Sequence, residues 1–290
     1  MPSRYLCCML AACVLATVGE RSARGDVLYG GTTNGYIYAI NTSNAATTEV
    51  GPALNGITPA FEFLSSLDFN PSGVLFGLDG RNGNLGIINT TNGQTTLITS
   101  SGLSSVGFLA GLAIDHTTGV AYVSDEDLEN LYSVNLSTGQ YTLLGNDGKE
   151  FSGLKLDALG NLYGEEYGTG QIYEVNPNTL ATTLVGAGAS SVPDMAVKTD
   201  AATLTFYETY DNPFPTVSDL GLYSPSSGFS PIGQLTTPGD PGGRFDGIAF
   251  YGQPAAPTPE PSSLALAGFG LATFAGRAWR RRKPTAAPVA

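Results

Sequence analysis

The sequence predicts an all-β protein, a five-bladed β-propeller whose first blade is completed by the last strand of the domain. Three observations support this fold class: an internal repeat with a period of about 46 residues, four short strands in each repeat, and no helical periodicity between the two ends of the chain. Four-stranded units that recur at such a period are typical of propeller blades. A β-sandwich is the alternative fold, but it does not predict the split first unit described below.

Each repeat contains an apolar strand that ends in a polar turn. The first residues of these turns are separated by 48, 46, 41 and 48 positions, and they are Asn41, Asn89, Asn135, Asn176 and Ser224. An Asn or Ser side chain at such a place accepts a hydrogen bond from the backbone two residues further on. In three repeats a glycine then supplies the left-handed conformation that ends the turn, namely Gly93, Gly139 and Gly228.

Two strands precede this turn in a repeat, and one follows it. The preceding pairs read SLDFNPSGVLFGLD, GLAIDHTTGVAYVSD, GLKLDALGNLYGEE and DMAVKTDAATLTFYE, and the strands that follow read TTEVG, TTLITS, YTLLGN, TTLVGA and FSPIGQ. The first repeat begins at Val27 with its second strand and lacks an innermost strand. A matching strand, DGIAFYG, occurs at residues 246–252. We therefore expect the propeller to span residues 26–252, with the C-terminal strand closing the ring and leaving no open edge.

Residues 1–25 have the features of a secretory signal peptide. A short basic start at Arg4 precedes an apolar core from Tyr5 to Val18. All three cysteines lie in this segment, at Cys7, Cys8 and Cys13, so the processed chain has no thiol for a disulfide or a thiolate metal site. Leu10 to Cys13 also fits a lipoprotein cleavage box, and lipidation of Cys13 is therefore an alternative.

The C-terminal end has three parts. Residues 253–261 form a proline-rich linker, which predicts a stiff, extended spacer. An apolar run from Leu264 to Trp279 follows, and then four consecutive cations. We expect a single transmembrane helix over residues 262–283, with its basic end in the cytoplasm, and a short tail over 284–290.

This tripartite segment resembles the PEP-CTERM sorting signal of exported bacterial proteins, which is processed by an exosortase, a membrane-embedded cysteine protease. The residues that carry the resemblance are Pro259, Glu260, Pro261, Arg280, Arg281, Arg282 and Lys283. The resemblance covers about a tenth of the chain. It implies export, a membrane-anchored intermediate, removal of the tail, and release to the cell surface or the extracellular matrix. An ordinary tail anchor is the alternative. Neither possibility indicates a reaction or a ligand for the domain.

The exported domain is strongly acidic. Between residues 26 and 256 the chain has five cations and 23 carboxylates, a net charge of −18, against −12 for the whole chain. Such a charge disfavours nucleic acid and anionic lipid as partners and keeps the domain soluble. It also favours divalent cations in a general way.

Acidic residues gather in two loops of the face on which propellers usually bind ligands. Asp125, Asp127, Glu165 and Glu166 are the candidate calcium ligands, because calcium requires oxygen ligands. Their spacing is not that of a dedicated calcium loop, so a solvated acidic rim is the alternative. Calcium is the only cofactor that the sequence suggests.

No catalytic constellation stands out. His116 is the only histidine, and it is expected on the face opposite those loops. Calcium-dependent lactonase propellers use carboxylate and asparagine at the channel mouth, for which the sequence offers Glu62, Glu150, Glu165, Glu208 and Asp194 without selecting among them. A glycosidase carboxylate pair is equally unselected. The strand aromatics are expected to pack between blades rather than to stack on sugars; they are Tyr36, Tyr38, Tyr132, Tyr163, Tyr173, Phe206 and Tyr207.

Two classes of function follow from the sequence. The first is a non-catalytic binding or structural protein of the cell envelope or extracellular matrix, with extracellular polysaccharide or an envelope protein as its partner. The second is a calcium-dependent propeller hydrolase, similar to a lactonase or a glycosidase. We favour the binding protein, because no acid, base or ligand set for an enzyme can be identified.

Overall fold

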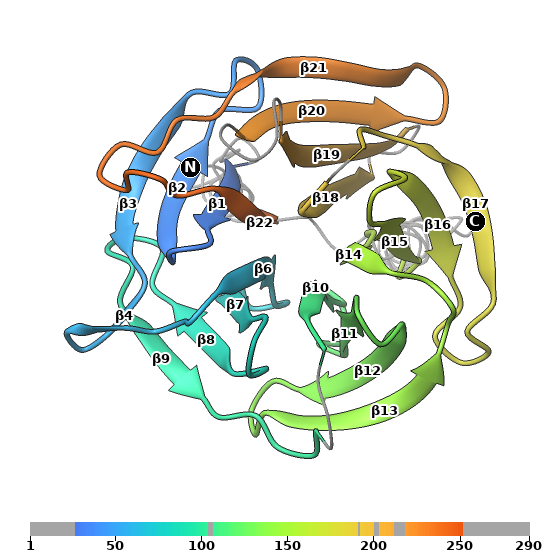
Figure 1. The fold of residues 1–290 in the computed structure, drawn as a ribbon, viewed down its shortest axis with the longest axis horizontal. Coiled ribbons are helices and arrows are strands. Elements are labelled where there is room, and N and C mark those ends of the chain that lie inside the picture. Colours follow the sequence, from blue (N-terminus) through green and yellow to red (C-terminus); the bar gives the residue numbers. More distant parts are fainter. Residues whose placement is uncertain (1–26, 104–106, 191, 200–202, 212–217, 252–290) are drawn as a thin grey trace, which may run out of the picture.

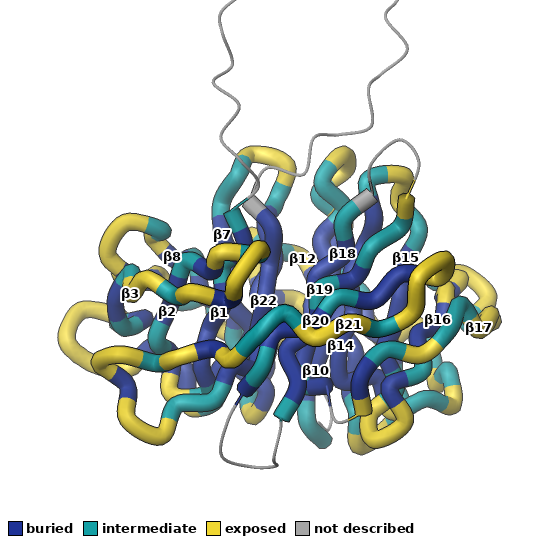
Figure 2. Tube along the Cα trace, turned by 90° about the horizontal axis from the view of Figure 1, so that it is seen from above, coloured by how far each residue is buried: buried dark blue, intermediate teal, exposed yellow. Residues whose placement is uncertain are grey.

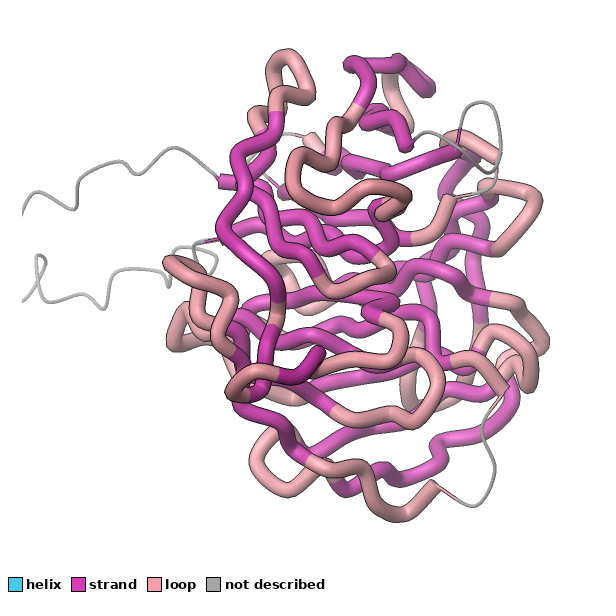
Figure 3. Tube along the Cα trace, turned by 60° about the vertical axis from the view of Figure 1, so that its left-hand side comes forward, coloured by secondary structure: helices cyan, strands magenta, loops and turns pink. Residues whose placement is uncertain are grey.

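The computed structural model describes residues 27–103, 107–190, 192–199, 203–211 and 218–251. The predicted signal peptide, linker and transmembrane helix lie outside these residues and stay predictions, and the sorting residues also lie outside them. The described part consists of strands and loops only (Figure 3). Within it, no helix has the length and apolar character needed to cross a membrane.

Five four-stranded antiparallel sheets form a closed ring, and each sheet is one blade (Figure 1). From the centre outward, blade 1 consists of β22 (Phe245–Tyr251), β1 (Val27–Thr32), β2 (Tyr36–Ile40) and β3 (Thr47–Pro52). Blade 2 consists of β6 (Leu64–Phe69), β7 (Leu75–Asp79), β8 (Leu85–Ile88) and β9 (Thr95–Ile98). Blade 3 consists of β10 (Leu109–Ile114), β11 (Ala121–Asp125), β12 (Asn130–Asn135) and β13 (Gln140–Asn146). Blade 4 consists of β14 (Phe151–Leu156), β15 (Leu162–Glu166), β16 (Gln171–Val175) and β17 (Thr182–Ala187). Blade 5 consists of β18 (Asp194–Thr199), β19 (Leu204–Asp211), β20 (Ser218–Ser224) and β21 (Gly228–Gln234).

The predicted split blade is confirmed. Strand β22 pairs with β1 in antiparallel register, from Val27 opposite Tyr251 to Gly31 opposite Gly247. The innermost strand of blade 1 therefore comes from the end of the domain, and its other three strands come from the beginning. This pairing closes the ring, so no innermost strand is left without a neighbour.

The polar turns have the predicted hydrogen bonds. The Asn41 Oδ1 atom accepts from the Ser43 N–H at 2.9 Å, and the same bond recurs at Asn89, Asn135 and Asn176. Gly93, Gly139 and Gly228 have φ values between 68° and 74°. In blades 1 and 4 the left-handed position holds Ala45 and Leu180 instead, so the turn geometry is kept where no glycine is present.

The hydrophobic core lies between neighbouring blades. In the innermost strands every residue whose burial is described is buried except the partly buried Lys198, whereas the outermost strands carry most of the exposed strand positions (Figure 2). Aromatic rings pack edge to face across the interfaces, such as Tyr163 against Phe206 at 5.3 Å between centroids. Five of the seven strand aromatics are buried and the other two, Tyr36 and Tyr207, are partly buried against the core. Their predicted packing role is confirmed.

One element was not predicted. Residues Leu54–Asn55 (β4) and Thr58–Pro59 (β5) form a small hairpin between blades 1 and 2. Its tip carries Ile57, whose side chain is 95% exposed. The segment is too short to show a strand periodicity in the sequence.

Candidate functional site

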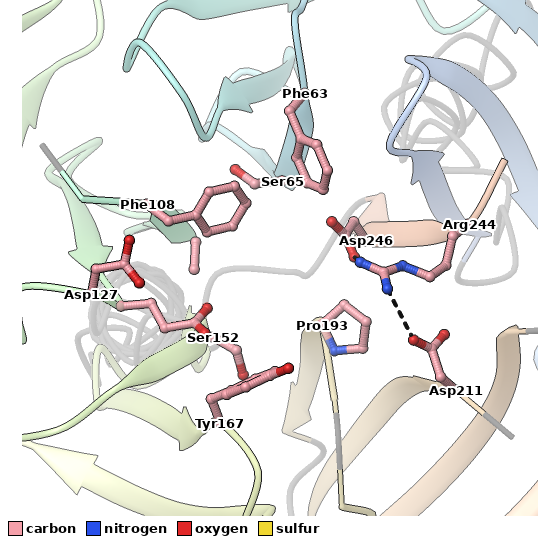
Figure 4. A pocket seen from close by; sticks show the side chains of 12 residues that line it. Phe63, Ser65, Phe108, Asp127, Ser152, Tyr167, Pro193, Asp211, Arg244 and Asp246 are labelled. Carbon is pink, nitrogen blue, oxygen red and sulfur yellow. Dashed lines mark hydrogen bonds and ion pairs between the residues drawn. The ribbon is translucent and has the colours of Figure 1, made fainter. Parts of the chain in front are cut away.

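A cavity of about 280 Å³ opens at the mouth of the central channel. Its lining comes from all five blades, at the beginnings of innermost strands and just beyond the ends of second strands (Figure 4). The lining residues are Phe63, Ser65, Phe108, Ala110, Glu126, Asp127, Ser152, Tyr167, Pro193, Asp211, Arg244 and Asp246. The site is concave because the innermost strands of all five blades begin around the axis of the ring.

Aromatic rings line part of the cavity. Phe63 and Phe108 pack edge to face, with their centroids 5.1 Å apart and their planes at 81°. The guanidinium carbon of Arg81 lies 5.8 Å from the Phe63 centroid, on the blade 2 side. Tyr167 remains 43% exposed although it lines the cavity. These rings offer apolar faces to a ligand that enters the channel mouth.

An arginine with two carboxylates forms the opposite side of the cavity (Figure 4). Arg244 donates to Asp211 at 3.2 Å and to Asp246 at 3.4 Å. Burial raises the pKa of Asp246 to about 7, although the Arg244 charge opposes the shift. Because both carboxylates hold the guanidinium in place, this side chain is a fixed feature of the cavity wall.

Two further carboxylates come from blade 3. Burial raises the pKa of Glu126 to about 7, and the charges of Asp127, Glu150 and Asp125 add to this shift. Neither Glu126 nor Asp127 is part of an ion pair seen in the described part of the chain. The cavity therefore has four carboxylates and one cation, which favours neutral or cationic ligands over anionic ones.

The floor of the cavity is a buried polar cluster that joins all five blades, which we call the axial hub: Ser66, Leu112, Lys155, Asp194 and Ile248. The Lys155 Nζ atom donates to Asp194 at 3.0 Å, to Ser66 Oγ at 3.0 Å and to the Leu112 carbonyl at 3.0 Å. Asp194 Oδ2 accepts from Ser66 Oγ at 2.9 Å and from the Ile248 N–H at 3.1 Å. Each hub residue lies one to three positions beyond a cavity-lining residue on its strand.

The structure separates the four candidate calcium ligands. Asp125 is buried and accepts hydrogen bonds from the N–H groups of Gly107 and Leu128, so it stabilises a loop. Asp127 lines the cavity. Glu165 is buried between blades, and Glu166 forms an ion pair with Lys149 at 2.8 Å. In the described residues no group of three or more His, Cys, Asp or Glu side chains could hold a metal ion. Calcium binding by these four together stays a prediction that the geometry does not favour.

The other candidates also lie apart. Glu62 and Glu150 are exposed, whereas Glu165, Glu208 and Asp194 are buried below the cavity. None of these five lines the cavity itself. His116 follows the end of β10, on the opposite face as predicted, with its Nε2 atom 3.3 Å from Asp68 Oδ1. Burial lowers the pKa of His116, but the hydrogen bond to Asp68 and the charges of Asp68 and Asp115 outweigh this, so the net shift is upward.

Glu126, Asp211 and Asp246 were not predicted as site residues from the sequence. Glu126 lies between Asp125 and Asp127, two of the candidate calcium ligands; Asp211 ends β19, and Asp246 is the second residue of β22. The sequence does contain one signal for these residues: the cavity is lined by residues at equivalent strand ends in successive repeats.

The cavity lies on the face of the ring opposite Val27 and Tyr251, the two ends of the described domain. Strand β22 starts next to Arg244, which lines the cavity, and ends at Tyr251, beside Val27. The first and last described residues of the domain therefore both lie at the face away from the channel mouth. A propeller held by its C-terminal segment would direct its cavity away from the attachment point.

The fold and this site define a closed five-bladed β-propeller with a ligand-sized cavity at its channel mouth. The chain carries a PEP-CTERM protein-sorting motif at residues 257–282. The motif implies an exported protein that is processed by exosortase and associates with the membrane. No curated protein matches the sequence.

Solved structures are similar to this chain at low sequence identity. A chain in the crystal structure of a nidogen/laminin complex matches with a TM-score of 0.55 and 14% identity, covering 78% of this chain and 98% of that one. The Neurospora crassa Pan2 WD40 domain matches with a TM-score of 0.43 and 13% identity, over 71% of this chain and 62% of that one. Hydrazine synthase of Kuenenia stuttgartiensis matches with a TM-score of 0.40 and 13% identity, over 59% and 49%. The first likeness supports the fold, and none of them assigns a ligand.

Proposed function

We propose that this protein is an exported, exosortase-sorted propeller that binds an extracellular glycan at its channel mouth without catalysis. The observation that carries the proposal is the placement of the cavity. It opens on the face opposite Tyr251, the last described residue before the sorting segment, so it would point outward during attachment.

The lining indicates which glycans fit. Sugar rings have apolar faces and many hydroxyls, which match the Tyr167 ring and the carboxylates of the cavity. The excess of carboxylates over cations disfavours uronate or sulfate polymers. Because about 280 Å³ is at the small end of ligand sites, a chain end or a branch sugar fits better than a long segment.

The binding prediction can be tested by calorimetry on the purified exported protein with neutral, amino-sugar and uronate oligosaccharides. We expect a neutral or amino-sugar ligand to bind, and Tyr167→Ala or Glu126→Gln to weaken binding about tenfold, the effect of losing one ring contact or one charged hydrogen bond. Glu174→Gln is the matched control, because Glu174 is exposed on β16 and does not line the cavity. Equal binding by all variants, or binding of uronate polymers alone, would contradict the proposal.

A hydrolase is the second candidate, and one observation favours it. Glu126 and Asp246 line the same cavity, and burial raises the pKa of each to about 7, in the range suited to a general acid. The same oligosaccharides, with lactones added, serve as substrates. Turnover that is lost in Glu126→Gln and retained in Glu174→Gln would establish the hydrolase and reject the non-catalytic function.

The sorting prediction concerns the mature C-terminus. We expect the mass of the protein isolated from its native host to correspond to a chain that ends near Pro259–Pro261, because the motif marks the segment for exosortase. Replacing the basic cluster at Arg280–Arg282 with glutamines should reduce processing, since these cations hold that end in the cytoplasm. A mature chain that ends at Ala290 would show a retained tail anchor instead.

A further inference from the structure

Two glutamates face each other between blades 4 and 5, below the wall of the cavity. Glu165 of β15 lies opposite Gly153 of β14, and Glu208 of β19 lies opposite Met195 of β18. Residues opposite each other on neighbouring strands share one face of the sheet. A Cβ atom placed on Gly153 would lie 3.2 Å from the Met195 Cγ atom, so these two faces form the interface between the blades. Both carboxylates therefore project into the same space.

These carboxylates lack the partners that buried charges require. Both side chains are fully buried. In the described residues, four buried side-chain oxygen or nitrogen atoms have no hydrogen-bond partner, and three of them are Glu165 Oε1, Glu165 Oε2 and Glu208 Oε1. The fourth oxygen of the pair, Glu208 Oε2, accepts from the Ala189 N–H at 2.8 Å. An isolated buried carboxylate is so unfavourable that it must be neutralised.

Lys155, the nearby cation, is not available to neutralise these two carboxylates. The three protons of the Lys155 ammonium are used by Asp194, Ser66 and the Leu112 carbonyl within the axial hub. Burial, together with the charges of Glu208 and Asp194, raises the pKa of Glu165 well above its usual range. The pair therefore has to take up a positive charge from solution, either a metal ion or a proton.

Gly188 lies directly against the Glu208 carboxylate. A Cβ atom on Gly188 would lie 1.9 Å from Glu208 Oε1 and 2.3 Å from Oε2, so any larger residue would displace the carboxylate. The backbone of Gly188 is not in the left-handed region, and glycine is not needed there for its conformation. The Glu208 carboxylate therefore occupies the space that a side chain at position 188 would take.

We propose that Glu165 and Glu208 bind one calcium ion between blades 4 and 5. Carboxylate oxygens without imidazole or thiolate select a hard cation, and a dication neutralises both charges. Magnesium keeps most of its water ligands, which a buried site disfavours. Since only two acidic ligands are present, backbone carbonyls or water would complete the coordination shell. The site is separate from the glycan cavity, and its test does not depend on glycan binding.

The test is a calcium titration of the purified exported protein after dialysis against a chelator. Extracellular calcium modules bind at about 10⁻⁴–10⁻³ M. At 10 mM calcium we therefore expect the folding equilibrium constant to rise about 10- to 100-fold, which for a domain of this size raises the Tm by about 3–10 °C. Calorimetry should give one ion per chain, and magnesium at the same concentration should give a smaller shift.

Glu165→Gln and Glu208→Gln should each abolish the calcium-dependent shift. Glu166→Gln is the matched control, because Glu166 is the neighbour of Glu165 in sequence but pairs with Lys149 outside the interface; this variant should retain the shift. A wild-type protein whose Tm does not respond to calcium would overturn the proposal, even if a variant fails to fold. So would a shift that persists in Glu165→Gln. A calcium-insensitive protein that gains stability as the pH falls would show that the pair shares a proton instead.

Discussion

A chain truncated after Gly239 is expected to lose the whole propeller, whereas a chain truncated after Tyr251 is expected to keep it. The shorter chain lacks β22, so β1 loses its inner neighbour and the ring opens. It also loses the buried side chains of Phe245, Ile248 and Phe250. Burying a large apolar side chain contributes roughly 1.5–3 kcal/mol, so three of them contribute about 5–9 kcal/mol, comparable with the total stability of a domain.

Circular dichroism and limited proteolysis of the two truncated chains would measure this difference. The longer chain is the matched control, because it removes the same linker and sorting segment but keeps the closing strand. We expect a cooperative thermal transition only in the longer chain. If the chain that ends at Gly239 melts at the same temperature, strand β22 is dispensable and ring closure does not determine stability.

The fold could be predicted because the same strand and turn pattern recurs in every repeat. Each blade repeats the Asn or Ser turn, so the period and the number of turns gave five blades, and the unit that begins at Val27 without an innermost strand indicated the closing strand. Alternating patterns in short strands are ambiguous one at a time, but agreement between repeats removes the ambiguity.

The site could not be predicted in the same way, because adjacency in sequence misleads on a strand. Glu165 and Glu166 are neighbours, but successive side chains of a strand point to opposite sides. One is therefore buried between blades and the other forms an ion pair with Lys149. The partner of Glu165 is Glu208, which comes from the next blade, and no spacing within one repeat indicates that pairing.

The axial hub was also invisible in the sequence. Lys155 and Asp194 lie in strands whose patterns resemble those of other repeats, and neither forms a local motif. They meet only because five innermost strands converge on one axis. A lone lysine in an apolar strand indicates that an acidic partner is buried beside it, because an unpaired buried cation is strongly unfavourable. The sequence does not indicate which acidic residue that partner is.

Lys155→Met is expected to destabilise the propeller by about 3–5 kcal/mol, the range for breaking a buried ion pair by removing one partner. The Lys155 and Asp194 side chains are almost completely buried, so solvent cannot replace the lost interaction. Asp194 would keep its hydrogen bonds from Ser66 and Ile248, but its charge would be left without a cation. Urea unfolding followed by fluorescence or circular dichroism would measure the change.

The double variant Lys155→Met/Asp194→Asn tests whether charge causes this loss. We expect it to be more stable than Lys155→Met alone, because the amide still accepts the Ile248 hydrogen bond without a net charge. Burial raises the pKa of Asp194 to about 7 although Lys155 opposes it. Without Lys155 the pKa of this carboxyl is higher still, so the destabilisation by Lys155→Met should shrink as the pH falls towards about 7 and change little below that, where Asp194 is protonated in both proteins. Losses that simply add in the double variant, or that do not depend on pH, would show that Lys155 acts by packing rather than by its charge.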